Sequence, residues 1–374
     1  MELLALSFKN FRNLESCTLS PSRGATVAVG SNGQGKTNLL EAIFFLVTLK
    51  PLRATRLNEL VQFGHDTAAV EGVFRIQGAD RTIRVEVIEG NRQASVDGKK
   101  ASSLEDYFGG LAVVAFTPED LAVMKGGPEA RRSFLDRSVF NRFPAYLKEA
   151  KIYSRALRSR NRLLKEGAPQ AYREVYDDAL IRSGTAIWLR RRALLKELSG
   201  RAESAFSTIG RLPHPARFGY RLSGLEGDFN ALSEADFSES FNQALARRQS
   251  RDLARGFTSV GPHSDDLDVR LGDHPARHFA SQGQQRALIL AWKLAEIENV
   301  RATLGFMPLL LLDDVSSELD PERNAYLMAT LVERQAQVFL TTTDASLVRS
   351  ASGPDTLWLQ VERGKFTASS ALPP

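Results

Sequence analysis

Eight consecutive residues, from Gly30 to Thr37, have the types and spacing of a loop that binds phosphate. They fit the pattern G-x-x-x-x-G-K-[ST] at every position. Glycines let successive backbone N–H groups turn inward around phosphate oxygens, and the positive end of the following helix faces the same anion. Lys36 can reach the β- and γ-phosphates of a nucleotide, and the Thr37 hydroxyl can ligate Mg²⁺. The alternative is a glycine-rich turn before a buried helix. The expected nucleotide-binding residues are Gly30, Ser31, Asn32, Gly33, Gln34, Gly35, Lys36, Thr37 and Asn38.

Two adjacent carboxylates, Asp313 and Asp314, follow the apolar run Leu309–Leu312. Such a run is typical of a buried parallel strand, which in this class of sheet ends beside the phosphate loop. We expect Asp313 to join Thr37 around Mg²⁺, and Asp314 to orient or deprotonate the attacking water. Lys36 and these two carboxylates are therefore the candidate catalytic residues. The alternative is that one Asp caps a helix, which leaves the second unexplained.

The segment from Ser281 to Arg286 opens an expected helix about 30 residues before the Asp pair. A hydroxyl and backbone N–H groups at that helix N-terminus can face a γ-phosphate, and the candidate contacts are Ser281, Gly283 and Gln284. Taken alone, the segment is equally well explained as an ordinary capped helix.

Two further segments follow the strands of this region. Ser317–Asp320 comes directly after the Asp pair, and Thr341–Asp344 follows the next expected strand. Together with Ser281–Arg286, this order and spacing resemble the signature, D-loop and switch elements of the ABC-type ATPases. The resemblance implies that the switch segment contacts the γ-phosphate. Because this segment has no histidine, Thr342 or Thr343 must make that contact through a hydroxyl.

The elements that must position these residues alternate between strand and helix at both ends of the chain. Strands are expected at 25–29, 309–312 and 338–341, and a helix at 36–48, whereas the middle of the chain predicts long helices at 144–166 and 170–200. The expected fold is an α/β, ABC-type P-loop ATPase head with an inserted, mainly helical lobe and no long coiled coil. The head is expected to comprise residues 1–118 and 256–374, and the lobe residues 119–255.

Positive charge is concentrated in the helical lobe. Residues 129–201 contain 18 Lys and Arg against 8 Asp and Glu, although the whole chain carries only +5. Part of this charge recurs every three or four residues along one expected helix, which places it in a single stripe. Such a stripe can track a DNA backbone without reading its sequence. The alternatives are a solvated helix face and a site for an acidic protein. The stripe consists of Lys148, Lys151, Arg155, Arg158 and Arg162.

The composition excludes several classes of protein. The single cysteine cannot close an intramolecular disulfide, which favours a reducing compartment. No apolar run approaches the ~18 residues needed to cross a bilayer, and the first residues lack the pattern of a signal peptide. We therefore expect a cytoplasmic protein that has no membrane partner.

Five segments resemble the RecF family of bacterial recombination-repair proteins, which are related to the SMC and Rad50 ATPases. The resemblance covers nearly the whole length, and its segments occur in the family's order. Small departures are Thr117, where Ser is common, and Ser264, where a basic residue is expected. The five segments are Gly30–Ile43, Phe116–Asp136, Thr258–Leu267, Ala280–Arg286 and Leu311–Asp320.

The resemblance implies an ATP- and Mg²⁺-dependent homodimer that binds single-stranded, double-stranded or gapped DNA. In this superfamily each nucleotide is held between the phosphate loop of one subunit and the signature of the other. Because the chain has one copy of each, two chains are required, and Ser281 and Gly283 would act in trans. The family also implies a weak, DNA-stimulated ATPase that works with RecR and RecO to help load RecA in repair and the SOS response.

Two features of the wider superfamily are missing, namely the switch histidine and an obvious glutamine that links the lobes. Glu119 is the candidate substitute for the glutamine, and Gln62 is a less suitable one. Their absence disfavours the nucleotide-binding subunit of an ABC transporter. A short SMC- or Rad50-like bridging protein is the other alternative, but it needs a long heptad insert, and the breaks at 167–169 and 213–215 interrupt one.

Overall fold

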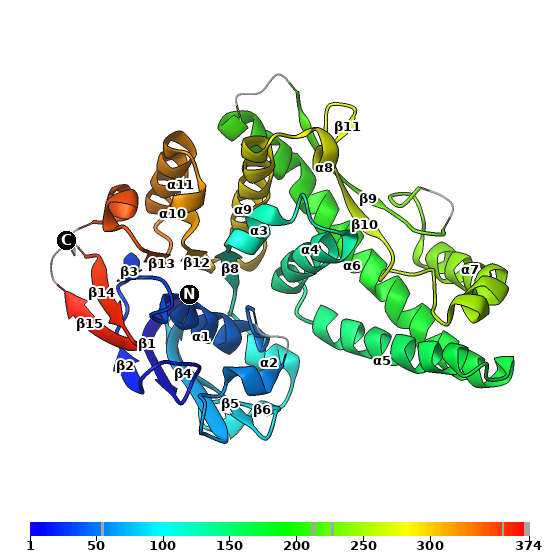
Figure 1. Cartoon of the computed structure of the whole chain (residues 1–374), viewed down its shortest axis with the longest axis horizontal. Coiled ribbons are helices and arrows are strands. Elements are labelled where there is room, and N and C mark those ends of the chain that lie inside the picture. The colour runs from blue at the N-terminus through cyan, green and yellow to red at the C-terminus, as the bar shows by residue number, and fades with distance from the viewer. Residues whose placement is uncertain (54–55, 211–213, 226–227, 354, 370–374) are drawn as a thin grey trace. The chain divides into compact units, whose positions relative to one another are not determined.

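The computed structural model describes residues 1–53, 56–210, 214–225, 228–353 and 355–369. The chain folds into two compact units. The first combines Met1–Asp120 with Glu296–Pro374, and the second is Leu121–Ala295. Among the described residues, no helix is long and apolar enough to cross a membrane. Figure 1 labels the elements of both units.

A mainly parallel sheet in the first unit carries the nucleotide motifs. Its strand order is β15-β14-β3-β13-β12-β8, and only the pairing of β14 with β15 is antiparallel. The central strands are apolar and completely buried, as expected for a parallel sheet that is covered on both faces. The strands are β3 (Ala25–Val29), β8 (Val113–Phe116), β12 (Leu309–Asp313), β13 (Val338–Thr342), β14 (Leu357–Glu362) and β15 (Lys365–Ser369).

Helix α1 (Lys36–Thr48) lies between this sheet and a second sheet in the same unit. It contacts β8, β12 and β13 on one side and β4 and β5 on the other. Its run of apolar residues, including Leu39, Ile43 and Phe44, is buried all round, as expected for a helix that has no solvent-facing side. The helix that follows the phosphate loop is therefore held rigidly.

The second sheet is antiparallel and has the order β2-β1-β4-β5-β6-β7. Buried residues alternate with more exposed ones along β4 and β5, so one face packs on α1. The strands are β1 (Glu2–Lys9), β2 (Cys17–Leu19), β4 (Thr67–Ile76), β5 (Ala79–Ile88), β6 (Asn91–Val96) and β7 (Lys99–Lys100). The unit also contains η1 (Leu57–Leu60), α2 (Leu104–Phe108), α10 (Val315–Glu318), α11 (Pro321–Glu333) and η2 (Ala345–Ala351).

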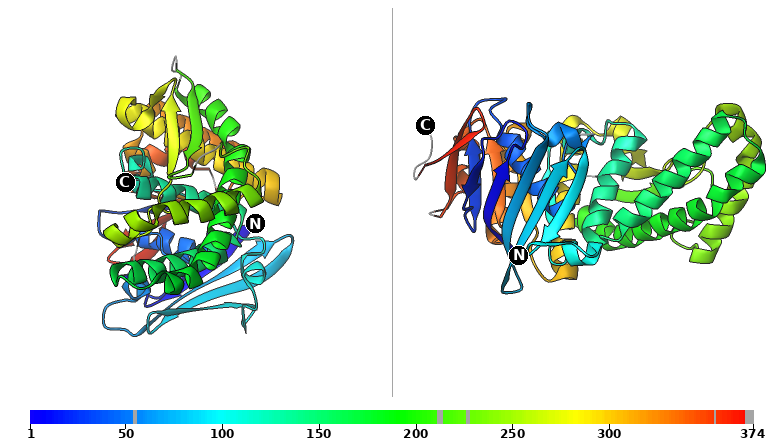
Figure 2. Two further views of the ribbon diagram at one scale, coloured as in Figure 1. Left: turned by 90° about the vertical axis from the view of Figure 1, so that its right-hand side faces the viewer. Right: turned by 90° about the horizontal axis from the view of Figure 1, so that it is seen from below.

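Long helices form most of the second unit. Helices α5 (Tyr146–Lys165) and α6 (Gln170–Gly210) pack against each other, and α7 (Glu234–Arg255) packs on both. Figure 2 shows these three helices together. The expected break at 167–169 separates α5 from α6, but α6 continues to Gly210 rather than ending near 200. The remaining helices are α4 (Pro128–Arg142) and α8 (Ala276–Phe279), together with α3 (Pro118–Ala122) and α9 (Gln282–Leu304), which both span the boundary between the units.

A three-stranded sheet extends the second unit beyond the expected lobe. Its strands are β9 (Ala216–Arg221), β10 (Asp266–Leu271) and β11 (His274–Pro275). We expected the inserted lobe to end at residue 255, whereas the compact unit continues to Ala295. The difference arises because β10 pairs with β9 along its whole length, so the residues that follow β10 belong to the same unit.

Candidate nucleotide-binding site

The loop of the Gly30–Thr37 motif connects β3 to α1, at the carboxyl edge of the parallel sheet. Two of its glycines are required by geometry. A Cβ on Gly30 would lie 2.4 Å from the carbonyl oxygen of Val361, and Gly35 has a φ of +108°. The backbone can therefore pass close to β14 and turn into the helix, as the sequence predicts.

Lys36 lies at the start of α1 and turns back over the loop. Its Nζ donates hydrogen bonds to the carbonyl oxygens of Gly30 at 2.6 Å and Ser31 at 2.9 Å. Burial lowers the pKa of Lys36, while the nearby charges of Asp314 and Asp313 oppose that shift. A single buried ammonium group thus faces the space enclosed by the loop.

The Thr37 hydroxyl and the Asp313 carboxylate meet even though 276 residues separate them. Thr37 Oγ1 donates to Asp313 Oδ1 at 2.7 Å. The hydroxyl of Thr341, from β13, donates to the same oxygen at 2.8 Å. Hard oxygen donors of this kind suit Mg²⁺, so the residues present fit the expected ion. Thr341 was not among the predicted site residues. It joins the site because β13 lies between β3 and β12.

Arg53 is a second site residue that the sequence motifs did not predict. Its guanidinium forms an ion pair with Oδ2 of Asp313, and its Nε lies 3.6 Å from a carboxylate oxygen of Glu119. Its backbone N–H donates to Glu41 of α1 at 3.1 Å. The guanidinium therefore contacts the carboxylate that is expected to bind the metal. Glu119 reaches the site through Arg53 rather than by lining the cavity itself.

Asp314 occupies a constrained position at the end of β12. Its φ of +49° lies in the left-handed region, and its backbone N–H donates to Thr341 Oγ1 at 3.0 Å. Burial raises the pKa of its carboxyl group. Its buried Oδ1 has no hydrogen-bond partner among the described residues. A buried acceptor of this kind is suited to hold a water molecule.

A C-terminal hairpin supports the phosphate loop from outside. The N–H of Gly364 donates to the carbonyl oxygen of Gln34 at 2.8 Å, and the N–H of Arg363 donates to the Gln34 side chain at 2.7 Å. On the inner side, Asn38 donates to Asn13 Oδ1 at 2.7 Å. Gln34 and Asn38, both expected to bind nucleotide, thus also have structural roles in this structure.

A cavity of about 340 Å³ collects these groups in the first unit. Of the predicted nucleotide residues in this unit, most of the loop and both carboxylates line it. Thr342 does not. Its side chain is completely buried, and its hydroxyl donates to the carbonyl oxygen of Asp344 at 2.9 Å. The cavity is lined by Asn32, Gly33, Gly35, Lys36, Thr37, Asn38, Arg53, Pro118, Asp313, Asp314 and Thr341.

The predicted signature residues lie in the second unit, at the start of α9. Ser281 Oγ accepts a hydrogen bond from the Gln284 N–H at 3.3 Å, and Gln284 Oε1 accepts one from the Ser281 N–H at 2.7 Å. This reciprocal pair caps the helix, so the capped-helix alternative describes the local geometry. Ser281 is exposed and Gly283 is half-buried, which leaves the helix N-terminus accessible to a partner.

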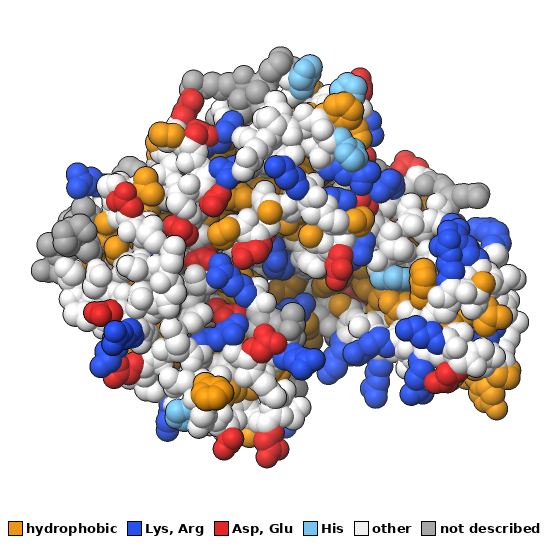
Figure 3. All heavy atoms as spheres, viewed as in Figure 1, with side chains coloured by type: hydrophobic (Ala, Val, Ile, Leu, Met, Phe, Trp, Pro, Cys, Tyr) orange, Lys and Arg blue, Asp and Glu red, His pale blue; other side chains and the backbone are white. Residues whose placement is uncertain are grey.

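The predicted DNA-binding residues share one exposed stripe on α5. All five are exposed, and one of them, Arg162, forms an ion pair with Glu166 at 3.8 Å. Figure 3 shows Lys and Arg side chains gathered over α5 and α7. Other arginines of the basic segment are buried and structural. Arg160 pairs with Asp177 at 2.7 Å, and Arg191 pairs with Asp136 at 2.8 Å.

Two more polar residues of this unit make buried or partly buried contacts. Arg131 forms a two-pronged ion pair with Asp266 at 2.7 and 2.8 Å. His263 has one ring nitrogen 2.6 Å from the Tyr153 hydroxyl and the other 2.9 Å from the Thr258 carbonyl oxygen. Both contacts support a structural role.

Comparison with known proteins assigns the chain to a family. The family described as the RecF/RecN/SMC N terminal domain matches residues 2–364. The chain is 61% identical over 377 residues to the DNA replication and repair protein RecF of Myxococcus xanthus (strain DK1622), covering 100% of this chain and 99% of that protein. The chain belongs to the RecF family. A more distant RecF, from Geobacter sulfurreducens (strain ATCC 51573 / DSM 12127 / PCA), is 39% identical over 98% of the chain and 100% of its own length.

Solved structures agree with this assignment to the RecF family. A structure described as the recombination mediator protein RecF-ATPrS in the RecFOR pathway matches with a TM-score of 0.88 and 31% identity, covering 98% of this chain and 97% of that one. An SMC head bound to the C-winged helix domain of ScpA matches with a TM-score of 0.54 and 17% identity over 99% and 97% of the two chains. The second likeness shows a shared fold. The α/β ATPase-head fold expected from the sequence is thereby confirmed, without a long coiled coil among the described residues.

Proposed function

We propose that this chain is an ATP-dependent DNA-binding protein of recombinational repair and replication. The observation that carries the proposal is the cavity in which Lys36, Thr37 and Asp313 converge from opposite ends of the chain. RecF structures in complexes named for ATP and ATPrS support ATP as the ligand. The ordered phosphate loop, the acidic strand end and the family together favour a nucleotide triphosphate over a purely structural turn.

The arrangement supports hydrolysis of ATP by residues of this chain. Thr37 and Asp313 would hold Mg²⁺, which would supply positive charge to neutralise the phosphates. Lys36 contributes a buried positive charge at the loop. Asp314 has the free buried oxygen that is needed to position a water molecule for attack on the γ-phosphate. Because the switch position has no histidine, we propose slow hydrolysis that controls release from DNA rather than driving a motor.

We further propose that two copies close around ATP. Each chain supplies one phosphate loop and one signature, so a complete pair of sites requires a two-fold dimer. The accessible N-terminus of α9 can then approach the γ-phosphate held by the partner copy. Thr343 is the better candidate for a hydroxyl contact from the switch segment, since it is exposed whereas Thr342 is buried.

The α5 stripe is the proposed DNA contact. Its residues are exposed, lie on one helix face and can neutralise backbone phosphates regardless of sequence. By family membership we propose action with RecR and RecO at gapped DNA, and indirect promotion of RecA loading. The mention of the RecFOR pathway for the solved relative supports these partners.

Sedimentation with and without Mg-ATP tests the ATP sandwich. The wild type is expected to shift from monomer to dimer, Lys36→Met to remain monomeric, and Asp314→Asn to accumulate as a long-lived dimer. A wild type that stays monomeric while saturated with nucleotide would contradict the proposed dimer. If Asp314→Asn dimers dissociate as fast as wild-type dimers, the role of Asp314 in hydrolysis is wrong.

DNA binding is tested by removing charge from α5. The combined change Arg155→Gln, Arg158→Gln and Arg162→Gln is expected to weaken binding of duplex, single-stranded and gapped DNA and to lower the salt dependence by about one contact per residue. The matched control replaces Lys196, Arg201 and Arg217, which are exposed elsewhere in the second unit, with Gln. Equal effects of the two variants would show that net charge, not the stripe, determines affinity.

A further inference from the structure

Helix α7 carries a second row of arginines. Arg247, Arg251 and Arg255 recur every four residues, which places them on one face of the helix. All three are exposed, and none of their side chains has a hydrogen bond or ion pair with another described residue. Three guanidinium groups therefore line one face without a carboxylate that neutralises them.

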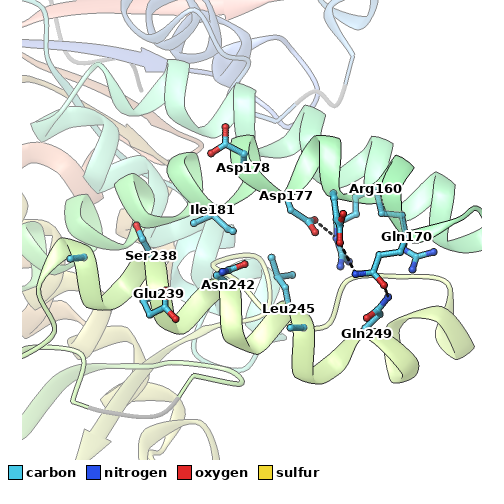
Figure 4. Close-up of a pocket in the computed structure, with 14 residues that line it drawn as sticks. Arg160, Gln170, Asp177, Asp178, Ile181, Ser238, Glu239, Asn242, Leu245 and Gln249 are labelled. Carbon is cyan, nitrogen blue, oxygen red and sulfur yellow. Dashed lines mark hydrogen bonds and ion pairs between the residues drawn. The ribbon is translucent and has the colours of Figure 1, made fainter.

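The acidic residues of α7 lie elsewhere. Glu234, Asp236 and Glu239 are all in its first two turns, and Asp252, in the basic half, is buried. Figure 4 shows Glu239 in the groove between α6 and α7, together with Asp177 and Asp178 of α6. The arginines of the α7 row do not line that groove. The groove is lined by both charges, since Arg160 and Arg173 lie among its carboxylates, whereas the row on α7 carries arginines alone.

The helix dipole does not explain this row. Basic residues are favoured at the C-terminus of a helix, but the effect is confined to the last turn. Arg255 lies in that turn, whereas Arg251 and Arg247 lie one and two turns earlier. The arrangement is therefore better explained by an external polyanion than by helix stability alone.

Helix α7 packs directly against the helix that carries the proposed DNA stripe. Arg160 of α5 lies 3.5 Å from Asp252 of α7, and Asn161 of α5 accepts a hydrogen bond from the Thr258 N–H at 2.8 Å. Packed helices have axes 8–10 Å apart as a rule. The two basic rows therefore lie on helices that pack against each other.

Apolar side chains are exposed where the α7 row ends. Leu253 and Phe257 are 43% and 44% exposed, and Phe257 follows Arg255 by two residues. Proteins that bind single strands combine cationic grooves with aromatic rings on which bases stack. An exposed aromatic beside unpaired arginines thus favours a strand whose bases are accessible.

We infer that the face formed by Arg247, Arg251, Arg255 and Phe257 is a second DNA-binding element, which engages the single-stranded part of a gapped substrate. This inference rests on the proposed DNA-binding function and extends it from α5 to α7. The arginines neutralise backbone phosphates, and the ring of Phe257 stacks on an unpaired base.

Fluorescence anisotropy with labelled DNA tests the element in the full chain. The variant Arg247→Gln/Arg251→Gln/Arg255→Gln is expected to bind single-stranded and gapped DNA about tenfold or more weakly at low salt. Its salt slope on single strands should fall by about 2, since each phosphate contact contributes about 0.7. The triple change Lys196→Gln/Arg201→Gln/Arg217→Gln is the charge-matched control and should leave the slope nearly unchanged.

The aromatic contribution is measured separately. Phe257→Ala should weaken single-stranded binding several-fold and leave blunt duplex binding unchanged, whereas Phe257→Trp should preserve it. Equal loss on both substrates would overturn the stacking role. ATP-dependent dimerisation of each variant, followed by sedimentation, verifies that the fold is intact.

The outcomes separate this inference from the proposed function. If the α5 variant weakens DNA binding while the α7 variant binds DNA as the wild type does, the DNA-binding role inferred for α7 is wrong and the proposed function stands. If the wild type binds no DNA at all, the proposed function fails. Weaker gapped-DNA binding by both variants, and a further loss when they are combined, would support one track over two helices.

Discussion

Asp313 is the residue on which the candidate site converges. One of its oxygens accepts hydrogen bonds from Thr37 and Thr341, and the other pairs with Arg53. Its side chain is almost completely buried, so these three partners hold it in one orientation. The same carboxylate is the proposed metal ligand. An ion bound through Oδ2 of Asp313 would have to displace the contact with Arg53.

Replacing Arg53 with Ala should make the metal site easier to fill. The guanidinium occupies Asp313 Oδ2, so its removal is expected to lower the Mg²⁺ concentration needed for nucleotide binding about threefold or more. A Mg²⁺ titration with a fluorescent ATP analogue measures the midpoint. Arg23→Ala, which removes an exposed arginine paired with Glu2, is the control. An unchanged midpoint would show that Arg53 does not compete with the ion.

His263 predicts how the second unit responds to acid. Burial lowers the pKa of its imidazole below the ordinary value of 6.5. The imidazole is therefore protonated more readily in the unfolded chain than in the folded chain. As a result, the free energy of unfolding should fall as the pH drops below about 6.5, by at most ~1.4 kcal/mol per pH unit.

The variant His263→Gln isolates this effect, since all other titrating groups remain. Urea unfolding at pH 7.5, 6.5 and 5.5 should give a smaller loss of stability with acid in His263→Gln than in the wild type. If the free energy of unfolding falls equally with acid in both proteins, protonation of His263 does not contribute to the loss of stability.

Among the elements, the C-terminal hairpin contributes more to the site than its distance along the chain suggests. Its turn residues Arg363 and Gly364 hydrogen-bond the phosphate loop through Gln34. The hairpin pairs with β3 through β14, which places the turn beside the loop that leaves β3. Displacing the turn should therefore affect both stability and nucleotide binding.

Gly364→Ala tests the hairpin. The residue has a φ of +83°, and a Cβ there would lie 1.9 Å from the Asn13 carbonyl oxygen. The change should lower the free energy of unfolding by more than ~1 kcal/mol, because it adds a backbone clash to the cost of a left-handed alanine, and should weaken ATP binding. Gly78→Ala is a matched control, since Gly78 has a φ of +86° and open space around it. Urea unfolding and nucleotide titration should distinguish Gly364→Ala from Gly78→Ala. Similar results for the two variants would show that the hairpin turn does not support the phosphate loop.

For the whole molecule, the central question is whether the two halves of an ATP site come from different chains. One chain contains one phosphate loop, in the first unit, and one signature helix, in the second. A two-fold dimer forms two sites from these parts, and each site combines both subunits. A site shared between two subunits can be tested by mixing two different variants.

Mixing two inactive variants should restore ATP hydrolysis. Lys36→Met retains an intact signature, and Ser281→Arg retains an intact phosphate loop, so their mixed dimer contains one complete site. An equimolar mixture is expected to regain at most about half of wild-type activity, because each mixed dimer contains one complete site out of two. Each variant alone is the control. A mixture that stays as inactive as its components would place the signature and loop of one site in the same chain.

Several local parts of this protein can be predicted from its sequence. The phosphate loop, the buried strand ending in Asp313 and Asp314 and the break between α5 and α6 are encoded by neighbouring residues, so pattern and spacing predict them. The family also follows from the sequence, because its five segments occur in order along the chain.

Long-range packing, in contrast, sets which distant side chains join these parts. Thr341 reaches Asp313 because β13 lies between β3 and β12, and strand order in a sheet depends on long-range pairing that local spacing does not encode. Arg160 and the stripe residue Arg162 look alike in sequence, but packing of α5 buries the first and exposes the second. The choice between a structural and a binding arginine is made by the neighbouring helices, since burial removes a charge from the reach of DNA.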